Sequence, residues 1–343
     1  MQIEYTHRIV FAGGWSAVEV RGLLESSRRT VLVAHVRADG DAVGALTGMY
    51  AVMKAVGCGE VTMLLPDGVP EELSWLPHAD AVLSGRSERE RCEEAIGQAD
   101  LIVGLDISGF GRTGVLAESL GRSEASKMLI DHHIGPDVAD VVVSEPEISS
   151  TCELVYWLMR EAYGREVFTP EAAECLYTGL CTDTGNFAYS NTHASLYLAA
   201  AELTQLGMDP MAVNRKIRNV FTLPRLRFFG HAMAECLTVY AERKVALMVL
   251  SAEETAAYGV DDGELTGLIN EVMKLRDIDC GILVREERDG VVRLSLRSKE
   301  IYDVNRLAGE MFGGGGHVRA AGATSDTGLA ETVEIVKQKL NLE

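Results

Sequence analysis

Carboxylate and imidazole side chains follow two apolar, strand-like runs of this chain. Residues 35–41, His-Val-Arg-Ala-Asp-Gly-Asp, come after the run 31–34, and the triplet Asp-His-His at 131–133 closes the run 128–130. The strands of an open α/β sheet end in a common crevice, so two such strands can build one metal site there. Oxygen-rich ligands with few nitrogens suit Mn²⁺ or Mg²⁺. The pattern predicts metal-assisted phosphate chemistry.

Within the first cluster, Asp39 and Asp41 are two residues apart in a loop, and His35 stands at the strand end. Both carboxylates can therefore turn toward one point. Gly40 permits a tight turn before the next helix, whose N-terminus is favourable for an anion. The alternative interpretation is a loop in which Asp39 caps the helix and His35 is merely buried.

Two further acids could face the same crevice. Asp106 ends the apolar run 101–105, where an aspartate can also be a simple N-cap. Asp183, in Thr-Asp-Thr-Gly at 182–185, follows an apolar helical stretch and by itself resembles a turn at a helix end. Side chains alternate between the faces of a strand, so packing alone does not explain the triplet 131–133. Together, these clusters favour a metal site.

A run of four glycines and a histidine, residues 313–317, lies between a predicted helix, 303–312, and a small-residue strand, 320–323. Successive N–H groups without side chains can approach an anion closely, so phosphate is the expected guest. The alternative is a flexible linker. Arg297 lies on a strand with alternating polar and apolar residues, and we expect it to clamp phosphate.

The elements that must position these residues form an α/β protein. Apolar runs alternate with amphipathic stretches between residues 30 and 144, which predicts a doubly wound, mainly parallel sheet. We expect this catalytic domain to span residues 1–208. Residues 209–236 are predicted to be a helical connector, and residues 237–343 a smaller α/β domain with a mixed sheet.

Composition limits the partners. The 343 residues suffice for two cores, and a net charge of −19 repels long polyanions, which favours a short anionic substrate. The seven cysteines lack the spacing of zinc or redox motifs. No secretion signal or membrane-spanning run is visible, so we expect a cytoplasmic protein without a membrane partner.

Taken in chain order, these motifs resemble the DHH phosphoesterase superfamily, and the distal glycines resemble its DHH-associated C-terminal domain. The resemblance spans nearly the whole chain. Within the superfamily, the length looks most like the NrnA-type enzymes. These cleave very short oligoribonucleotides to 5′-mononucleotides and convert 3′-phosphoadenosine 5′-phosphate to AMP. The resemblance implies the same substrates here, and hydrolysis by water that two divalent cations activate, Mn²⁺ being expected and Mg²⁺ the alternative.

The resemblance also implies roles for individual residues. The metal ligands would be His35, Asp39, Asp41, Asp106, His132 and Asp183. One ion would be held by His35 and Asp39, the other by Asp41, His132 and Asp183, with Asp106 as the bridge. The catalytic group would be Asp106, His132, His133 and Asp131, with His133 facing the phosphate and Asp131 orienting a ligand. The substrate-binding residues would be Arg297, Ser298, Gly314, Gly315, Gly316 and His317.

Four other functions compete with this one. The runner-up is a cyclic-dinucleotide phosphodiesterase of the same superfamily, resembling GdpP without its membrane and sensor segments. An inorganic pyrophosphatase would lack the distal glycine signature, and a RecJ-like exonuclease on long strands is disfavoured by size and charge. A non-catalytic nucleotide-binding regulator on the same scaffold would be expected to lose the acids. By analogy, a homodimer is expected.

Overall fold

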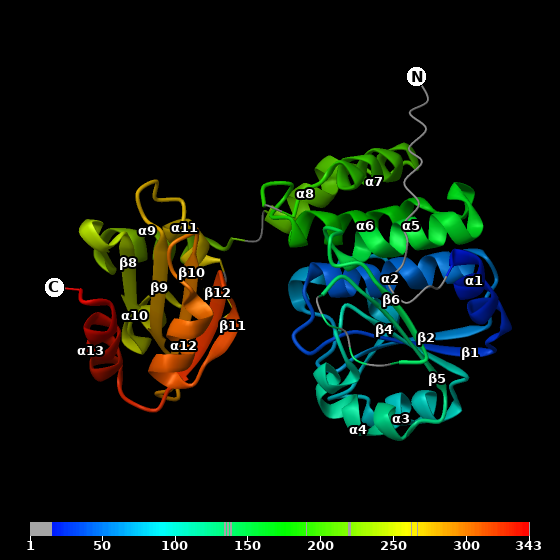
Figure 1. Ribbon diagram of the computed structural model, residues 1–343, viewed down its shortest axis with the longest axis horizontal. Coiled ribbons are helices and arrows are strands. Elements are labelled where there is room, and N and C mark those ends of the chain that lie inside the picture. The colour runs from blue at the N-terminus through cyan, green and yellow to red at the C-terminus, as the bar shows by residue number, and fades with distance from the viewer. Residues whose placement is uncertain are drawn as a thin grey trace. The chain divides into compact units, whose positions relative to one another are not determined.

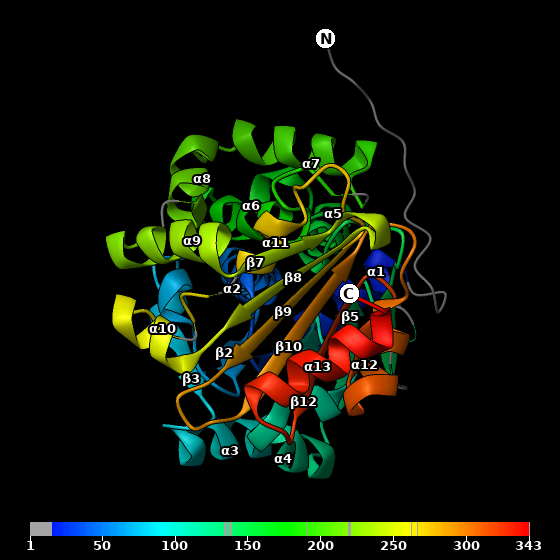
Figure 2. The ribbon, with the colours of Figure 1, turned by 90° about the vertical axis from the view of Figure 1, so that its left-hand side faces the viewer.

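The computed structural model describes residues 16–133, 135, 137, 139–189, 191–218, 221–261, 263–265 and 267–342. The chain divides into two compact units, Met1–Val220 and Phe221–Glu343 (Figures 1 and 2). Throughout these described ranges, every helix is too short or too polar to cross a bilayer.

The first unit contains one sheet and eight helices in its described part. Its strands are β1 (Arg29–Val33), β2 (Glu60–Leu65), β3 (Val82–Ser84), β4 (Leu101–Leu105), β5 (Ser126–Asp131) and β6 (Val141–Ser144). Its helices are α1 (Ala17–Ser26), α2 (Gly40–Ala55), α3 (Arg89–Gln98), α4 (Ala117–Arg122), α5 (Thr151–Tyr163), α6 (Pro170–Asp183), α7 (Ala194–Gln205) and α8 (Pro210–Arg218). Short 3-10 turns occupy Glu71–Leu73, Ala79–Ala81, Phe110–Leu116 and Arg165–Val167.

The sheet of the first unit is parallel throughout, in the order β3-β2-β1-β4-β5-β6. Successive residues of these strands pack into different hydrophobic cores, one on each face of the sheet. Leu32 and Val103 pack on the side of α2 and α5, whereas Val31 and Ile102 pack against α3 and α4 (Figure 1). The predicted doubly wound sheet is therefore confirmed. Strand order reverses between β1 and β4, and in such folds the crevice at this switch point is where ligands bind.

Glycines let α2 and α6 approach closely beside that crevice. A Cβ on Gly44 of α2 would lie 2.5 Å from the carbonyl oxygen of Cys175, and one on Gly179 of α6 would lie 2.6 Å from Oδ1 of Asp41. Both contacts are shorter than real Cβ atoms tolerate. Any side chain here would push the helices apart, and with them Asp41 and Asp183.

The second unit contains a mixed sheet. Its strands are β7 (Leu237–Tyr240), β8 (Val245–Leu250), β9 (Cys280–Glu286), β10 (Val292–Ser298), β11 (Gly315–His317) and β12 (Ala320–Ser325). Its helices are α9 (Leu223–Glu235), α10 (Ala252–Tyr258), α11 (Leu268–Val272), α12 (Val304–Phe312) and α13 (Leu329–Leu340), with a 3-10 turn at Ala241–Arg243. The order is β11-β12-β10-β9-β8-β7, and β8 runs parallel to β9 while the other pairs are antiparallel. The mixed sheet predicted for this region is confirmed.

Helices cover both faces of this second sheet. α12 and α13 lie together on one face, where Val304 and Val336 join a core with the strands (Figure 2). α9 and α11 cover the other face through Phe228 and Leu268.

The segment 209–236, predicted as a connector, is divided between the two units. Its first helix, α8, buries Val213 in the core of the first unit. Its second helix, α9, buries Phe228 and Phe229 in the second unit. Each helix buries an apolar face within its own unit, and the division of the chain into two units falls after residue 220.

Asp279 at the start of β9 holds a loop of the second unit. Its carboxylate accepts the N–H groups of Glu300, Ile301 and Tyr302 at 2.8, 3.0 and 3.2 Å. Burial alone would raise the pKa of Asp279, but these backbone hydrogen bonds outweigh it and hold the pKa below its usual value.

We expect Asp279→Asn to lower the free energy of unfolding of the second unit by about 1.5–3 kcal/mol at neutral pH, because charged hydrogen bonds are lost. Because the pKa of Asp279 is lower in the folded state, its ionised carboxylate stabilises the fold at pH values above the unfolded-state pKa of about 3.9. This stabilisation is lost as the pH falls through the folded-state pKa. Urea melts of both proteins should therefore converge below about pH 4. Exposed Asp277 supplies the control Asp277→Asn, and an equal loss there would contradict the assignment.

Candidate metal centre

Five of the six predicted metal ligands of the first unit lie at strand or helix ends around the switch point, and the sixth, Asp39, is the N-cap of α2. His35 lies two residues beyond β1, and Asp106 directly follows β4. His132 follows the last residue of β5. Asp41 is in the first turn of α2, and Asp183 is the last residue of α6. Parallel strands and helix ends thus deliver all five side chains to one edge of the sheet.

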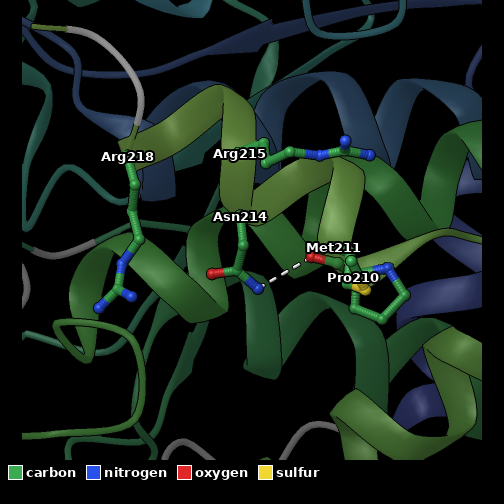
Figure 3. Close-up of a pocket in the computed structure, with 5 residues that line it drawn as sticks. All are labelled: Pro210, Met211, Asn214, Arg215 and Arg218. Atoms are coloured by element: carbon green, nitrogen blue, oxygen red, sulfur yellow. Dashed lines mark hydrogen bonds between the residues drawn. The ribbon is translucent and has the colours of Figure 1, made fainter.

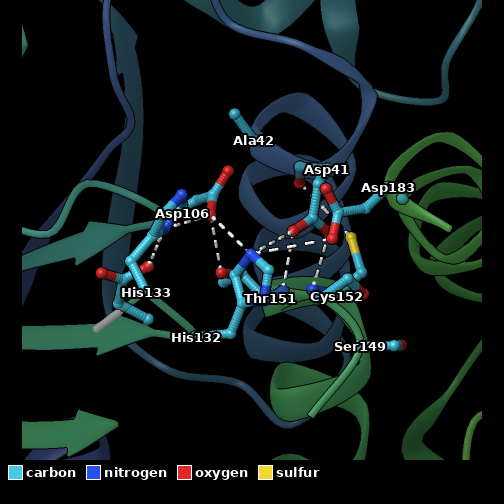
Figure 4. Close-up of polar contacts among 12 residues, drawn as sticks. Asp41, Ala42, Asp106, His132, His133, Ser149, Thr151, Cys152 and Asp183 are labelled. Atoms are coloured by element: carbon cyan, nitrogen blue, oxygen red, sulfur yellow. Dashed lines mark hydrogen bonds and ion pairs between the residues drawn. The ribbon is translucent and has the colours of Figure 1, made fainter. Parts of the chain in front are cut away.

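The side chains of Asp41, Asp106, His132 and Asp183 point toward one another (Figure 4). Nε2 of His35 lies 3.5 Å from Oδ2 of Asp106. Nε2 of His132 lies 3.7 Å from Oδ1 of Asp106, 3.7 Å from Oδ2 of Asp183 and 3.9 Å from Oδ2 of Asp41. Asp106 therefore faces both histidines with different oxygens, which is the arrangement that a bridging carboxylate requires.

The ligand atoms fall into overlapping groups, each with all atoms within 4.8 Å of one another. The groups are His35 with Asp39 and Asp106, Asp41 with His132 and Asp183, and Asp106 with His132 and His133. The first two groups correspond to the two ligand sets that the resemblance implies, with the bridging Asp106 in the first. The structure thus brings together every residue of the first unit that was predicted to hold metal.

The first cluster also fits its alternative interpretation. Asp39 is the N-cap of α2, and its Oδ1 accepts the N–H groups of Asp41 and Ala42 at 3.1 Å. His35 is 7% exposed, and its Nδ1–H donates to the carbonyl of Val36 at 2.8 Å. That bond directs the lone pair of Nε2 toward Asp106. Capping and burial here orient the ligand atoms, so the two interpretations are compatible.

The N-terminus of α5 holds Asp41, which the sequence did not reveal. Asp41 is 1% exposed; its Oδ2 accepts the N–H of Thr151 at 2.7 Å and its Oδ1 that of Cys152 at 2.9 Å. The Thr151 hydroxyl donates to Oδ1 of Asp106 at 2.9 Å. Thr151 therefore positions two carboxylates at once. The sequence around residue 151 gives no sign of this contact, because nothing local indicates which distant acid a helix end receives.

We expect Thr151→Val to weaken Mn²⁺ activation about 10–100-fold, as is usual when the partner of a metal ligand is removed. The isosteric side chain keeps the backbone bond to Asp41. Activity titrated against Mn²⁺ measures the effect. Thr47→Val is the matched control, since Thr47 is equally buried and donates to the helical carbonyl of Val43. Unchanged Mn²⁺ dependence in Thr151→Val would contradict the positioning role.

A second residue outside the prediction contacts Asp183. Nδ2 of Asn191 donates to Oδ2 of Asp183 at 3.3 Å and to the carbonyl of Ser149 at 2.9 Å. Asn191 thereby orients Asp183 and ties it to the loop before α5. Nothing in the sequence around Asn191 indicates that its side chain contacts Asp183.

Asp131 and His133 form a pair beside Asp106. Oδ1 of Asp131 lies 2.8 Å from Nδ1 of His133, and Oδ2 accepts the N–H of Ser108 at 2.8 Å. The hydrogen bond to Asp131 raises the pKa of His133 to about 9. Asp131 is fully buried, whereas the His133 side chain is 29% exposed. Of this pair, His133 is the residue that a substrate could reach.

The donor set suits divalent cations. Burial, together with the charges of Asp106 and Asp39, raises the pKa of Asp41 far above its usual value. Burial and the charge of Asp41 likewise raise the pKa of Asp183. Carboxylates held together against burial and repulsion are stabilised when a cation lies between them. Oxygen ligands with imidazole nitrogen and no thiolate match Mn²⁺ or Mg²⁺.

The predicted substrate-binding residues lie in the second unit. Gly315, Gly316 and His317 form the exposed strand β11, paired with β12. The N–H of Gly316 donates to Oδ1 of Asn305 at 2.9 Å. A Cβ on Gly314 would lie 2.3 Å from the carbonyl of Gly322. Close sheet packing therefore explains part of the glycine requirement.

Two more of those residues lie on β10. Arg297 is half-buried, and its Nη1 donates to the carbonyl of Leu296 at 3.0 Å. Ser298 is 9% exposed, and its hydroxyl donates to the carbonyl of Tyr302 at 2.7 Å. The Ser298 side chain is thus occupied inside the unit, because the strand end turns its hydroxyl toward the following loop.

A separate hollow of about 310 Å³ lies along α8 (Figure 3). It is lined by Pro210, Met211, Asn214, Arg215 and Arg218. None of the predicted site residues lines it.

Comparisons with known proteins agree with this geometry. Residues 29–180 match the DHH family, N-terminal domain, and residues 242–342 match the DHHA1 domain. The chain belongs to the DHH family. It is a phosphoesterase of the DHH superfamily, and its motifs and ligand clusters all lie within these two matched regions or directly beside them.

Relatives cover nearly the whole chain. The bifunctional oligoribonuclease and PAP phosphatase NrnA of Thermus thermophilus is 29% identical over 90% of this chain and 89% of its own length. The cyclic-di-AMP phosphodiesterase GdpP of Geobacillus thermodenitrificans is 25% identical over 94% of this chain and 48% of its own length.

Solved structures show the same fold. The crystal structure of an exopolyphosphatase-related protein from Bacteroides fragilis has a TM-score of 0.93 and 31% identity, and the match covers 98% of each chain. RecJ of Thermus thermophilus in complex with Mn²⁺ has a TM-score of 0.56 and 15% identity, covering 98% of this chain and 56% of RecJ. The latter likeness concerns the fold alone.

Proposed function

We propose that this phosphoesterase hydrolyses very short oligoribonucleotides to 5′-mononucleotides and 3′-phosphoadenosine 5′-phosphate to AMP. The convergence of His35, Asp41, His132 and Asp183 around the shared carboxylate of Asp106 carries the proposal. Likeness to the NrnA protein over most of both chains supports these substrates. The net charge of −19 favours short substrates, since long strands normally require an extended basic channel.

The residues fit two divalent cations, with Mn²⁺ proposed. His35 and Asp39 would hold one, Asp41, His132 and Asp183 the other, and Asp106 both. When bound, such a pair of cations supplies an activated water and neutralises charge on the phosphate oxygens.

The protein groups contribute orientation. Thr151 and the first N–H groups of α5 fix Asp41 and Asp106 before substrate arrives. Asp131 fixes the ring of His133, whose partly exposed edge we assign to the substrate phosphate. Groups held in place beforehand need little reorganisation during the reaction, which lowers its barrier.

A turnover panel with added Mn²⁺ tests the proposal. It compares a diribonucleotide, a long oligoribonucleotide, a cyclic dinucleotide and 3′-phosphoadenosine 5′-phosphate. We expect the diribonucleotide and 3′-phosphoadenosine 5′-phosphate to be hydrolysed, with kcat/KM at least about tenfold above the long strand. Preference for the long strand would overturn the proposal.

The second candidate function is cyclic-dinucleotide hydrolysis. Likeness to GdpP over 94% of this chain favours it. In the same panel, faster turnover of the cyclic dinucleotide than of the diribonucleotide would establish this alternative.

We also propose that Arg297, Gly314, Gly315, Gly316 and His317 bind the nucleotide. Ser298 would act through the loop that its hydroxyl holds at Tyr302. His317 lies exposed on β11. His317→Ala should raise KM about tenfold, the value of a hydrogen bond to a charged group, with little change in kcat. Val318→Ala, at the neighbouring exposed residue, is the control. Equal losses in Mn²⁺ affinity and KM would count against a role in substrate binding.

A further inference from the structure

A second group of metal-ligating side chains lies in the second unit, apart from the residues of the candidate metal centre. Nε2 of His231 lies 3.6 Å from Sγ of Cys236 and 3.7 Å from Oε1 of Glu254. Sγ of Cys236 lies 3.4 Å from the same Oε1. All three side chains are half-buried. Three different ligand types thus face one point that solvent can reach.

The surrounding structure holds each ligand in place. His231 is in the last turns of α9, and its ring stacks on Tyr258 with centroids 5.1 Å apart. Cys236 is the C-cap of α9. Glu254 belongs to the capping box of α10, where its Oε2 accepts the N–H of Ser251 at 2.9 Å and its hydroxyl at 2.7 Å. Oε1 of Glu254 is therefore the oxygen directed at the cysteine and the histidine.

The spacing matches a tetrahedral zinc site. With the usual bond lengths of about 2.0–2.1 Å to nitrogen, 2.3 Å to sulfur and 2.0–2.2 Å to oxygen, the ligand atoms of a tetrahedron lie about 3.3–3.6 Å apart. The three distances here are 3.4, 3.6 and 3.7 Å. A cation at the centre needs shifts of only a few tenths of an ångström.

We propose that His231, Cys236 and Glu254 bind Zn²⁺, with a fourth position open to solvent. Imidazole, thiolate and carboxylate are all zinc ligands, and the thiolate distinguishes this site from the oxygen-rich centre of the first unit. The ion would link the C-terminal end of α9 to the first turn of α10. A thiolate and a carboxylate balance its two positive charges.

Burial and the charge of Glu254 raise the pKa of Cys236 to about 11, so the thiol is protonated and donates to Glu254 at neutral pH. Binding forms the sulfur–zinc bond, and the thiol proton is released to the buffer.

Co²⁺ replacing Zn²⁺ gives a test with a signal that depends on the thiolate. The full chain, first saturated with Mn²⁺, is titrated with Co²⁺, and the sulfur-to-cobalt charge-transfer absorption is recorded. We expect the band in the wild type and its displacement by Zn²⁺. Cys236→Ala should abolish it, and Glu254→Gln, which preserves the capping box, should weaken Co²⁺ binding at least about tenfold.

Matched variants separate this site from other cysteines. Cys58, the other half-exposed cysteine, serves as the control Cys58→Ala, which should keep the full band. Buried Cys152 lies beside Asp41, so Cys152→Ala tests whether the first unit produces the signal. No band in the wild type, or a band that persists in Cys236→Ala, would overturn the proposal. Turnover of the diribonucleotide should be unchanged in Cys236→Ala.

Discussion

Replacing Asp106 with Asn is expected to lower turnover of a diribonucleotide at least about a hundredfold, or about 2.7 kcal/mol in activation free energy. Asp106 faces His35 with one carboxylate oxygen and His132 with the other. Asn keeps an oxygen that can accept the Thr151 hydroxyl, but it removes the charge that two cations would share. Steady-state hydrolysis with saturating Mn²⁺ measures the loss.

The choice of Asn matters because Asp106 has a φ of 58°. Asp and Asn tolerate this left-handed conformation, whereas Ala adds backbone strain. Asp106→Ala would therefore mix a folding defect with the loss of a ligand. Exposed Asp80 provides the control Asp80→Asn. Activity of Asp106→Asn above a few per cent of wild type, with a normal thermal melt, would refute the bridging role.

His132→Ala is expected to reduce turnover by a similar factor, at least about a hundredfold, and to shift the Mn²⁺ dependence to higher concentration. Its Nε2 lies within 3.7–3.9 Å of the carboxylates of Asp106, directly after β4, Asp41 of α2 and Asp183 of α6. Removing the imidazole leaves these acids without their shared nitrogen partner. Activity titrated against Mn²⁺ at fixed substrate separates weaker metal binding from a slower chemical step.

Exposed His193, the N-cap residue of α7, supplies the control His193→Ala. Because its side chain makes no capping hydrogen bond, this change should leave both turnover and Mn²⁺ dependence near wild type. If His132→Ala retains the wild-type Mn²⁺ midpoint, His132 is not a metal ligand, whatever the loss in rate.

The motif residues could be predicted because their positions follow from local pattern. Residues 35, 106 and 132 each lie at the carboxyl end of an apolar run, and parallel strands end along one edge of the sheet. The partners of those residues could not be predicted. Thr151 contacts Asp41 across 110 residues of chain and Asp106 across 45 residues, and Asn191 contacts Asp183 across 8 residues. No periodicity marks such pairs.

The boundary near residue 209 and the role of the glycine run could not be predicted from the sequence either, because both depend on packing. Both α8 and α9 are amphipathic, and only packing decides which core receives Val213 and which receives Phe228. Gly314 and Gly316 were interpreted as an anion cradle, whereas the structure also shows β11 packed so closely on β12 that a Cβ would collide. A glycine at a site of close approach and a glycine at a ligand look alike in sequence.

By itself, the sequence determined the α/β class and the two kinds of sheet, because strand periodicity is a local property. The order of its motifs determined the resemblance to the DHH family. Tertiary structure decided which oxygens face which nitrogens and which helix end holds Asp41. It also decided that His231, Cys236 and Glu254 meet. The sequence does not indicate this last group, because its members come from α9, its cap and α10. Only the packing of those helices brings a nitrogen, a sulfur and an oxygen within 4 Å of one another.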